Sequence, residues 1–445
     1  MIDWKTIILQ NPWWKGNKDL DLLKVEDSSF FIERKNLKIT PNTIYLIKGP
    51  RRVGKSIYLK TIAQNNPKDS TYINLDTLPN IKINDLIKTI EQDISVNSKK
   101  ILLLDEIQSL EDGCEFLKAM VDLNTLKDVC VFVTGSDPRS IEKCKQVLIG
   151  RSQEIKIMFP LTFRQFLLTI LKKENSNLFN ILKNSKINLE DKNNIIFENY
   201  KILEPYFIEL DTYFKIFLLT GGFPETINSY FSTKKISEKY YEDIIQKIFE
   251  KMDKNKSINI LKIIVDCLSC SLKYTTLSRK TSYSQDTIKS YLEDLEELLI
   301  IFEIKESSKS LIKKFYIKDP FIIHSIINYY NNLDSFIESK NLLFNELELG
   351  KFVENVVGSH LHNIYNLNLK YFNVDKKEVD FIYKNKAVEV KYRNNIVMPN
   401  LIDGVEEYII LSKLILGPAD IIQDNRLVIP VCIFLGLLEN PNNFL

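Results

Sequence analysis

The stretch TIYLIKGPRRVGKSIYLKTIAQ, residues 43–64, is the most informative part of this sequence about its fold class. Its first five residues are apolar or β-branched and predict a buried strand, whereas the residues after Ser56 have the apolar spacing of a helix. Between them, GPRRVGKS matches the pattern G-x-x-x-x-G-K-[ST] in the strand, loop and helix setting that a phosphate-binding loop requires. The stretch therefore predicts a site for nucleotide phosphates at a helix N-terminus.

The loop residues have distinct expected roles. Gly49 and Gly54 permit backbone conformations and close approaches that a Cβ would block. Lys55 is expected to reach the β- and γ-phosphates of ATP, and the Ser56 hydroxyl a magnesium ion. The residues predicted to bind the nucleotide are Gly49, Pro50, Arg51, Arg52, Val53, Gly54, Lys55, Ser56 and Ile57.

Two later strands supply further candidate residues. The run KKILLLDEIQ, residues 99–108, predicts a strand that ends in Asp105 and Glu106. We expect Asp105 to hold magnesium and Glu106 to orient or deprotonate the attacking water. The run VCVFVTGSD, residues 129–137, predicts a strand whose Thr134 or Ser136 senses the γ-phosphate, although T-G-S-D is also good turn chemistry.

Arg151 is the preferred candidate for a cation that stabilises transition-state charge. It would act in cis or from a neighbouring subunit, and an ordinary surface arginine is the alternative.

Bulk composition is that of a globular protein. The 445 residues are enough for two to four domains, 44% are hydrophobic and 27% charged, and a net charge of +2 provides no global field for nucleic acid or anionic membranes. The six scattered cysteines predict reduced thiols and a cytoplasmic location, with the C-x-x-C at Cys267 and Cys270 packed in a core. The apolar run 427–438 is too short to cross a bilayer and is expected to be a buried strand.

Several motifs together resemble a known family. They are QNPWW (10–14), GPRRVGKS (49–56), LLLDEIQ (102–108), VTGS (133–136), LIGRSQEIKIMFPLTFRQF (148–166) and LTGGFPE (219–225). In this order they resemble archaeal and bacterial ATPases of the AAA+ superfamily that carry a C-terminal domain of unknown function. The resemblance implies a three-layer α/β P-loop core of the ASCE/AAA+ type, then a helical lid. It also implies that Gly222-Phe223-Pro224 contacts adenine, with Pro224 lining the nucleotide pocket.

The segment from residue 258 to residue 304 has the outline of a winged helix. A groove-reading helix is expected over residues 285–298, with Ser284, Gln285, Thr287 and Lys289 near its start. Its far half is acidic, which phosphate would repel. A DNA reader and a structural or protein-contact module therefore both remain open.

The stretch KKEVDFIYKNKAVEVKYR, residues 376–393, predicts two strands joined by a turn. Asp380 lies on the first strand, and Glu389 and Lys391 lie two apart on the second, hence on one face. This D…E-x-K arrangement resembles restriction-endonuclease-like nucleases, and Glu354 on the preceding helix would be a fourth member. Carboxylates would bind magnesium and the lysine would position water. The alternative is a nuclease-like fold whose chemistry is lost or serves partner binding.

These observations predict an α/β protein with four parts. They are an N-terminal segment with a P-loop core (1–165), a helical lid (166–255), a winged helix (256–320) and a nuclease-like α/β domain (321–445). The expected function is ATP hydrolysis with Mg²⁺ that switches the C-terminal parts. The alternatives are an ATP-gated DNA nuclease and a nucleotide-binding scaffold without enzymatic activity. DNA, a protein partner and a homo-oligomer are left open, and no membrane partner is expected.

Overall fold

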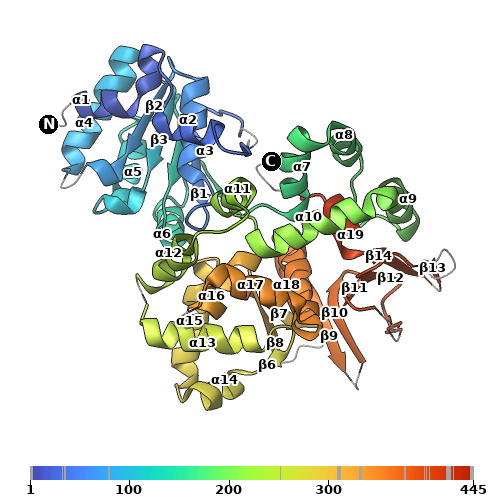
Figure 1. The fold of residues 1–445 in the computed structure, drawn as a ribbon. Coiled ribbons are helices and arrows are strands. Elements are labelled where there is room, and N and C mark those ends of the chain that lie inside the picture. The colour runs from blue at the N-terminus through green and yellow to red at the C-terminus, as the bar shows by residue number, and fades with distance from the viewer. Residues whose placement is uncertain are drawn as a thin grey trace. The chain divides into compact units, whose positions relative to one another are not determined.

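The computed structural model describes residues 4–32, 34, 37–78, 81–250, 252–307, 312–329, 333–374, 377–394, 396, 398–399, 401–416, 422–423 and 425–440. The chain divides into two compact units, one ending at Phe159 and the other beginning at Pro160. Figure 1 labels the helices and strands of both. Within the described residues, no helix is both long and apolar enough to span a bilayer.

The first unit alternates strands and helices. Its elements in chain order are α1 (Trp4–Gln10), η1 (Pro12–Lys15), α2 (Leu20–Glu26), β1 (Ile44–Lys48), α3 (Lys55–Asn65), β2 (Ser70–Asn74), η2 (Leu75–Thr77), α4 (Ile83–Asn97), β3 (Ile101–Asp105), η3 (Ile107–Ser109), α5 (Gly113–Asp122), β4 (Cys130–Thr134), α6 (Pro138–Val147) and β5 (Gln153–Ile157). The predicted strand after Asn42 is therefore present as β1.

The five strands of this unit form one parallel sheet in the order β2-β3-β4-β1-β5. Strand β4 lies between β1 and β3, with Thr134 opposite Ile47 of β1 and Val133 opposite Leu104 of β3. In a parallel sheet the carboxyl ends of all strands lie at one edge, which is where such sheets bind ligands. The phosphate loop and the ends of β3 and β4 consequently share that edge.

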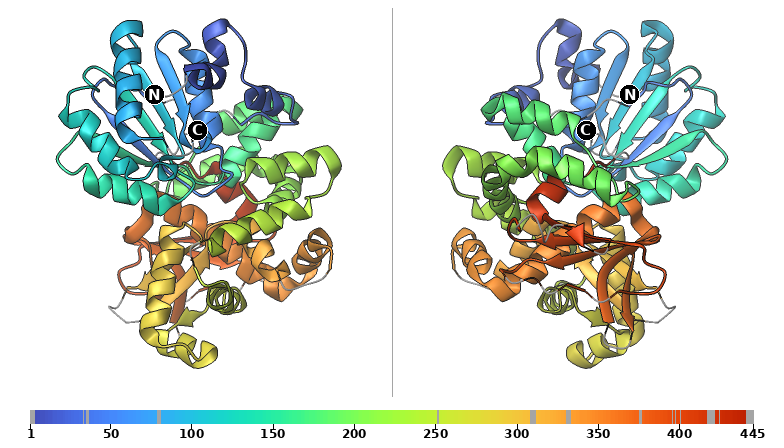
Figure 2. Two further views of the ribbon diagram at one scale, coloured as in Figure 1. Left: turned by 90° about the vertical axis from the view of Figure 1, so that its left-hand side faces the viewer. Right: turned by 90° about the vertical axis from the view of Figure 1, so that its right-hand side faces the viewer.

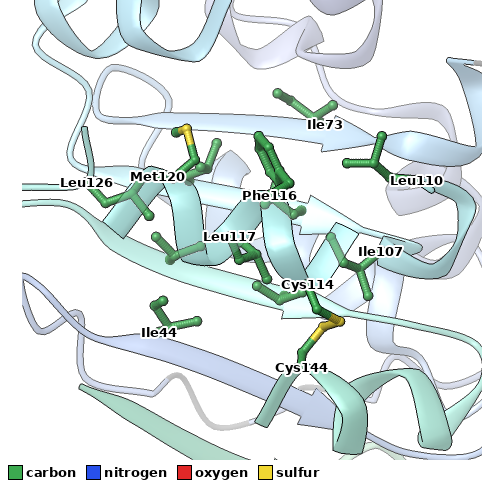
Figure 3. Packing of buried hydrophobic residues seen from close by; sticks show 14 of the residues in the cluster. Ile44, Ile73, Ile107, Leu110, Cys114, Phe116, Leu117, Met120, Leu126 and Cys144 are labelled. Carbon is green, nitrogen blue, oxygen red and sulfur yellow. A yellow bond between two sulfur atoms is a disulfide. The ribbon is translucent and has the colours of Figure 1, made fainter. Parts of the chain in front are cut away.

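Successive residues of a strand pack on opposite faces of this sheet. Ile44 and Leu46 of β1 belong to a buried cluster with residues of α4, α5 and α6, among them Phe116 and Met120, and Figure 3 shows part of this packing. Tyr45 lies between them in sequence and stacks on Phe132 of β4, with ring centroids 5.0 Å apart. Because strand side chains alternate between faces, one face carries α4, α5 and α6 while Tyr45 and Phe132 lie on the other.

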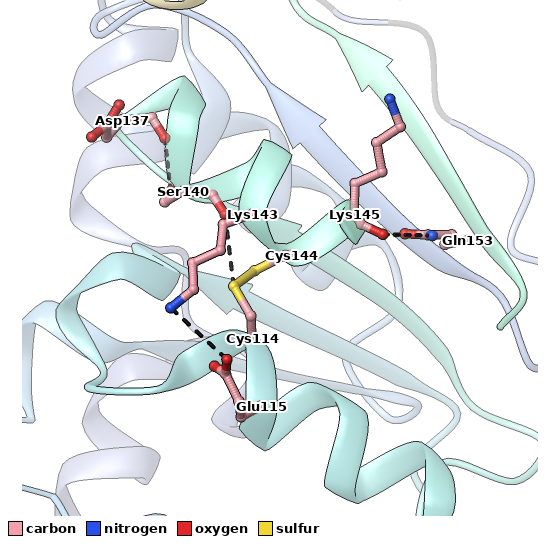
Figure 4. Close-up of a disulfide and its surroundings, with 8 residues drawn as sticks. All are labelled: Cys114, Glu115, Asp137, Ser140, Lys143, Cys144, Lys145 and Gln153. Atoms are coloured by element: carbon pink, nitrogen blue, oxygen red, sulfur yellow. Dashed lines mark hydrogen bonds and ion pairs between the residues drawn. A yellow bond between two sulfur atoms is a disulfide. The ribbon is translucent and has the colours of Figure 1, made fainter. Parts of the chain in front are cut away.

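A disulfide joins two helices of the first unit and corrects the expectation of six reduced thiols. Cys114 in the first turn of α5 is bonded to Cys144 near the end of α6, with their Cα atoms 4.7 Å apart (Figure 4). The two cysteines are 30 residues apart in sequence, so spacing alone gave no sign of the pair. Cys130, Cys267, Cys270 and Cys432 are free thiols, and Cys270 is exposed, so the predicted core packing of the C-x-x-C pair is wrong for that residue.

The second unit is a set of helices and one large sheet. Its elements are α7 (Phe163–Glu174), α8 (Ser176–Asn184), α9 (Asn193–Leu203), η4 (Glu204–Tyr206), α10 (Phe207–Thr220), α11 (Pro224–Thr233), α12 (Glu238–Phe249), α13 (Lys254–Asp266), β6 (Ser271–Leu272), α14 (Tyr274–Thr281), α15 (Gln285–Glu297), β7 (Ile301–Glu306), β8 (Lys313–Ile317), α16 (Pro320–Asn328), α17 (Ser335–Phe344), α18 (Glu346–Tyr365), η5 (Asn366–Asn368), β9 (Lys370–Val374), β10 (Lys377–Tyr383), β11 (Lys386–Lys391), β12 (Glu407–Ser412), β13 (Ile422–Gln423), β14 (Arg426–Pro430) and α19 (Val431–Leu437).

The nine strands of this unit run in the order β13-β14-β12-β11-β10-β9-β7-β8-β6, and Figure 2 shows them from two sides. Strands β9, β10 and β11 are successive antiparallel neighbours, whereas β11, β12 and β14 pair in parallel. Strand β7 joins the two parts of the sheet by pairing with β8 on one side and β9 on the other. The strands of the expected winged helix and of the expected nuclease-like fold thus belong to one sheet.

The prediction that the apolar run 427–438 is a single strand is wrong, because the run contains the end of a strand and a helix. Strand β14 ends at Pro430, and the buried helix α19 follows directly. Proline has no N–H to donate to a sheet ladder, and its fixed φ suits a helix start. All seven residues of α19 are buried, so the helix has no polar face and its sequence shows no helical period.

Candidate nucleotide site and C-terminal carboxylate cluster

The phosphate loop leaves β1 and leads into α3, as its motif predicts. Gly54 adopts φ +96 and caps the N-terminus of α3, a conformation that a side chain would strain. Gly49 is required for a different reason: a Cβ there would lie 2.5 Å from the carbonyl oxygen of Met158. Met158 in turn donates its N–H to the Lys48 carbonyl at 2.7 Å. The first glycine therefore permits close packing of the chain after β5 against the loop.

Lys55 holds the loop together from inside. Its buried ammonium donates to the carbonyl oxygens of Gly49 and Pro50, both at 2.8 Å. Ser56 and Ile57 are half-buried in the first turn of α3, and Val53 is fully buried. The ammonium is thus already located within the loop that would surround a phosphate.

Arg34, which the motif search did not single out, supports this loop from behind. Its buried guanidinium donates to the carbonyl oxygens of Val53 at 3.0 Å and Phe159 at 3.3 Å. Burial lowers the pKa of this group to about 10, so it remains charged at neutral pH. A lone arginine upstream of the first strand carries no spacing signal, which is why sequence reasoning missed it.

Asp105 ends β3 and is held by two hydroxyl groups. The Tyr72 hydroxyl donates to its Oδ2 at 2.8 Å, and the Thr134 hydroxyl makes a close hydrogen bond with its Oδ1. Burial, followed by the charge of Asp105, raises the pKa of Tyr72 well above its usual value, so the phenol keeps its proton. The carboxylate expected to hold magnesium is therefore fixed in orientation by the neighbouring strands β2 and β4.

Glu106 follows directly and has the left-handed backbone value φ +58. Its Oε2 accepts the backbone N–H of Ser136 at 2.8 Å and a close hydrogen bond from the Gln108 side-chain amide. Gln108 also donates to the Ser136 hydroxyl at 3.0 Å. The structure thus brings the ends of β3 and β4 together through side chains. Gln108, part of the LLLDEIQ motif, was given no role on the sequence.

Arg151 does not lie at the sheet edge that carries the phosphate loop. It donates through two nitrogens to Asp122, at 2.7–3.0 Å, at the end of α5. Its neighbour Ser152 accepts the N–H of Ile44 at the start of β1, so Arg151 lies beside the amino ends of the strands. The phosphate loop follows the carboxyl end of β1. This position at the opposite edge argues against the predicted role in cis, and a role from a neighbouring subunit stays a prediction.

Pro224 belongs to the second unit and is the first residue of α11. The turn before it is closely packed: the Gly222 N–H donates to Asp319 at 2.8 Å, and the Gly222 carbonyl accepts the Leu161 N–H at 2.8 Å. A Cβ on Gly221 would lie 2.0 Å from Asp319 Oδ1. Both glycines therefore have a packing reason in the second unit, and the adenine contact of Pro224 stays a prediction.

The four predicted C-terminal residues also lie together. Glu354 is on α18, Asp380 on β10, and Glu389 and Lys391 on β11. The Asp380 N–H donates to Glu389 Oε2 at 3.1 Å, the Val390 N–H donates to Asp380 Oδ2 at 2.8 Å, and the Lys391 ammonium makes a close ion pair with Glu389 Oε1. The antiparallel pairing of β10 and β11, which the sequence predicts, thus brings Asp380 close to Glu389.

A fifth and a sixth side chain from β8 enter this cluster, and the sequence offered no signal for either. The Lys314 ammonium lies 3.4 Å from Glu354 Oε1 and 3.8 Å from Asp380 Oδ1, and the Tyr316 hydroxyl donates to Glu354 Oε1 at 2.8 Å. Burial, and then the charge of Asp380, raises the pKa of Glu354 and that of Glu389 above the usual value of a glutamate. Among the described residues, no three His, Cys, Asp or Glu side chains are arranged to hold a metal ion.

Comparisons with known proteins bear on these two regions. Residues 41–167 match the family described as AAA domain, and residues 211–332 match a domain of unknown function. An uncharacterized protein of Methanocaldococcus jannaschii is 27% identical over 425 residues, covering 88% of this chain and 87% of its own.

Two solved structures match the chain with low TM-scores. The Orc1 protein of Aeropyrum pernix in complex with DNA has a TM-score of 0.31 at 9% identity, covering 67% of this chain and 88% of its own. A structure described under katanin self-assembly has a TM-score of 0.26 at 12% identity, covering 64% and 80%. Both scores are too low to support an argument. The residues that match the AAA domain model, 41–167, include the parallel sheet and the phosphate loop that follows β1.

Proposed function

We propose that the first unit binds ATP with Mg²⁺ and hydrolyses it. The observation that carries the proposal is the meeting of three strand ends at one sheet edge. The loop with Lys55 follows β1, Asp105 ends β3, and Thr134 ends β4 and contacts Asp105. The AAA domain match over residues 41–167 supports the same assignment.

The roles follow from these positions. Lys55 would exchange its bonds to the loop carbonyls for phosphate oxygens, while backbone N–H groups at the start of α3 bind the same phosphates. Ser56 and Asp105 would hold magnesium, and when bound the ion neutralises charge on the β- and γ-phosphates. Asp105 suits a hard cation because it is a buried carboxylate whose orientation two hydroxyls already determine.

Glu106 would orient the attacking water and accept its proton. Its contacts with Gln108 and the Ser136 N–H hold the carboxylate beside the end of β4. Ser136 and Gln108 are thus proposed as the residues that position this base, and Thr134 as the one that positions Asp105. The two sensor candidates would thus have different roles: Thr134 is the partner of Asp105, and Ser136 is the partner of Glu106.

Nucleotide binding and single-turnover hydrolysis test the proposal on three variants. We expect Lys55→Ala to abolish tight ATP binding, and Glu106→Gln to bind ATP while turnover is lost. Lys60→Ala is the matched control, because Lys60 lies on the same helix but pairs with Asp19 and Asp21. Wild-type ATP affinity in Lys55→Ala would refute the phosphate-loop assignment. Unchanged nucleotide in the wild type, after hours with magnesium, would favour a scaffold without enzymatic activity.

We propose that residues 256–320 form a winged helix which the ATPase cycle switches. The support is the element order α13, β6, α14, α15, β7, β8, in which β6 and β7 both pair antiparallel with β8. Gln285 and Lys289 on α15 are exposed, although Lys289 lies 3.8 Å from Glu293. The partner is DNA or a protein.

Anisotropy of labelled duplex DNA, measured with an ATP analogue and with ADP, distinguishes the two partners. DNA binding that depends on the nucleotide and weakens in Lys289→Glu would select a DNA reader. No binding in either state would exclude DNA and leave a protein.

A further inference from the structure

The Lys314 side chain is the centre of the C-terminal carboxylate cluster. It comes from β8, is 1% exposed, and its ammonium lies 2.8 Å from Glu378 Oε1, 3.4 Å from Glu354 Oε1 and 3.8 Å from Asp380 Oδ1. The ring of Tyr371 on β9 lies below it, with its centroid 5.3 Å from the nitrogen. Three carboxylates from α18 and β10 thus converge on one buried cation supplied by the chain itself.

Because the Lys314 ammonium is buried, it requires partners of opposite charge. Moving an ammonium or a carboxylate out of water is unfavourable, and a buried charge that loses its partner strongly destabilises a fold, so buried charges persist only with partners. Burial lowers the pKa of Lys314, but the surrounding Tyr316, Glu354, Asp380 and Glu378 outweigh it, so that its pKa lies well above the usual value. The lysine is therefore a permanent cation in this position.

The carboxylate oxygens that a metal ion would need already have donors from the protein. Asp380 Oδ2 accepts the Val390 N–H and Oδ1 faces Lys314, while Glu389 Oε2 accepts the Asp380 N–H and Oε1 pairs with Lys391. Glu354 Oε1 is shared by the Tyr316 hydroxyl and Lys314. A Mg²⁺ ion needs several oxygen ligands at about 2.0–2.1 Å around one point. The point on which the carboxylates of Glu354, Glu378 and Asp380 converge is already occupied by the Lys314 ammonium.

We propose that the Lys314 ammonium is the resident cation of this cluster and takes the place of a divalent metal ion, so that the cluster binds no Mg²⁺ or Mn²⁺ while Lys314 is present. The carboxylates then serve to join α18 and β10 to β8 through a buried charge cluster. The D…E-x-K pattern remains, but the reaction that depends on its metal is absent. This inference is independent of the ATP site, which lies in the other unit.

Mn²⁺ binding to the full chain without nucleotide tests the proposal, with free Mn²⁺ followed by its electron paramagnetic resonance signal. The variants are wild type, Asp380→Asn, Lys314→Ala and the double variant Lys314→Ala with Asp380→Asn. We expect wild type and Asp380→Asn to bind the same amount of Mn²⁺. Lys314→Ala should bind one additional equivalent, and the double variant should lose it again.

Lys313→Ala is the matched control, because Lys313 is the neighbouring residue on β8 but pairs with Glu303 and Tyr274 instead of the cluster. It should gain no Mn²⁺. If Lys314→Ala does not fold alone, millimolar Mn²⁺ should restore its circular dichroism by replacing the lost charge. Mn²⁺ bound by wild type and lost in Asp380→Asn would overturn the proposal. So would a Lys314→Ala protein that neither gains Mn²⁺ when folded nor recovers with it when unfolded.

Discussion

Arg34 supports the phosphate loop without belonging to its motif. Its two hydrogen bonds reach the loop carbonyl of Val53 and the Phe159 carbonyl, so it links the loop to the chain after β5. Hydrogen bonds made by charged groups contribute about 1.5–3 kcal/mol each. A residue outside the motif can therefore help to hold the motif's backbone in the conformation that binds phosphate.

We therefore predict that Arg34→Ala lowers ATP affinity about tenfold, which corresponds to about 1.4 kcal/mol. The reason is that Val53 and its neighbours lose the tether that holds the loop. Calorimetric titration with a non-hydrolysable ATP analogue measures the effect. Arg151→Ala, which removes an arginine at the opposite sheet edge, should leave affinity unchanged. Equal affinity in Arg34→Ala and wild type would show that the loop keeps its shape without the tether.

The three histidines of the chain are all in the second unit, and burial is the main cause that lowers their pKa values. The pKa is lowered to about 4 for His324 and His360 and to about 2 for His362. His360 illustrates the cause, because its Nε2 accepts the Phe163 N–H at 2.8 Å and Nδ1 donates to the Val356 carbonyl at 2.7 Å. A proton on Nε2 would break the first of these bonds.

We predict that no histidine resonance titrates between pH 8 and pH 5 in spectra of the folded protein labelled at histidine. Since the unfolded chain takes up protons near pH 6.5 and the folded chain does not, stability falls as the pH decreases from about 6.5 to about 4. The loss is about 3 kcal/mol each for His324 and His360. A resonance with a midpoint near pH 6.5 would contradict this burial.

Among the elements, helices α5 and α6 are joined in two ways. Cys114 and Cys144 form the disulfide, and Lys143 lies 3.9 Å from Glu115 beside it (Figure 4). These helices follow the strands that end in Asp105 and Thr134, so the link is close in sequence to the proposed site. A disulfide that closes a loop of this length stabilises a fold by about 2–4 kcal/mol.

Reduction, or the double replacement of Cys114 and Cys144 by serine, should destabilise the first unit by about 2–4 kcal/mol. Urea unfolding followed by tryptophan fluorescence measures this, because Trp4, Trp13 and Trp14 all belong to that unit. Cys270→Ser removes an exposed free thiol and should have no effect. Identical unfolding midpoints with and without reductant would mean that the link contributes nothing to stability.

The turn between α10 and α11 leaves no room for a side chain at Gly222. A Cβ on Gly222 would lie 2.2 Å from the Leu161 carbonyl oxygen and 2.4 Å from the Leu161 nitrogen, both backbone atoms. We expect Gly222→Ala to destabilise the second unit by about 1–3 kcal/mol, as overpacking does. Gly350→Ala, within α18 and with nothing within 4 Å of its Cβ position, should instead stabilise it by up to about 1 kcal/mol. Thermal unfolding of the two variants, followed by circular dichroism, tests the opposite signs.

At the scale of the whole molecule, the tryptophan and histidine side chains report on different units, because all three tryptophans lie in the first unit and all three histidines in the second. The tryptophans lie in the N-terminal segment, where Asn11 exchanges two 2.8 Å hydrogen bonds with the backbone of Tyr72 on the edge strand β2. Trp13 packs edge-on against the Tyr72 ring. The segment QNPWW thus covers a sheet edge, and tryptophan fluorescence follows the unit with the phosphate loop.

An ATP analogue with magnesium, at about 100 times its dissociation constant, should stabilise the first unit by about 2.7 kcal/mol. Tryptophan-detected thermal unfolding measures this shift, with Lys55→Ala as the protein that should not respond. Absence of any tryptophan-detected shift in wild type would contradict nucleotide binding by the first unit.

The amino-acid sequence alone was enough to predict the phosphate loop, the strand ending in Asp105, and the C-terminal hairpin with Asp380 and Glu389. These are local patterns, in which a few neighbouring residues specify both the backbone and the chemistry. The folded structure was needed to find the disulfide of Cys114 and Cys144, the hydrogen bonds from Arg34 to the loop, the position of Arg151 at the opposite sheet edge and the insertion of Lys314 among the carboxylates. Each depends on contacts between residues distant along the chain, and in an isolated sequence such contacts produce no period or spacing.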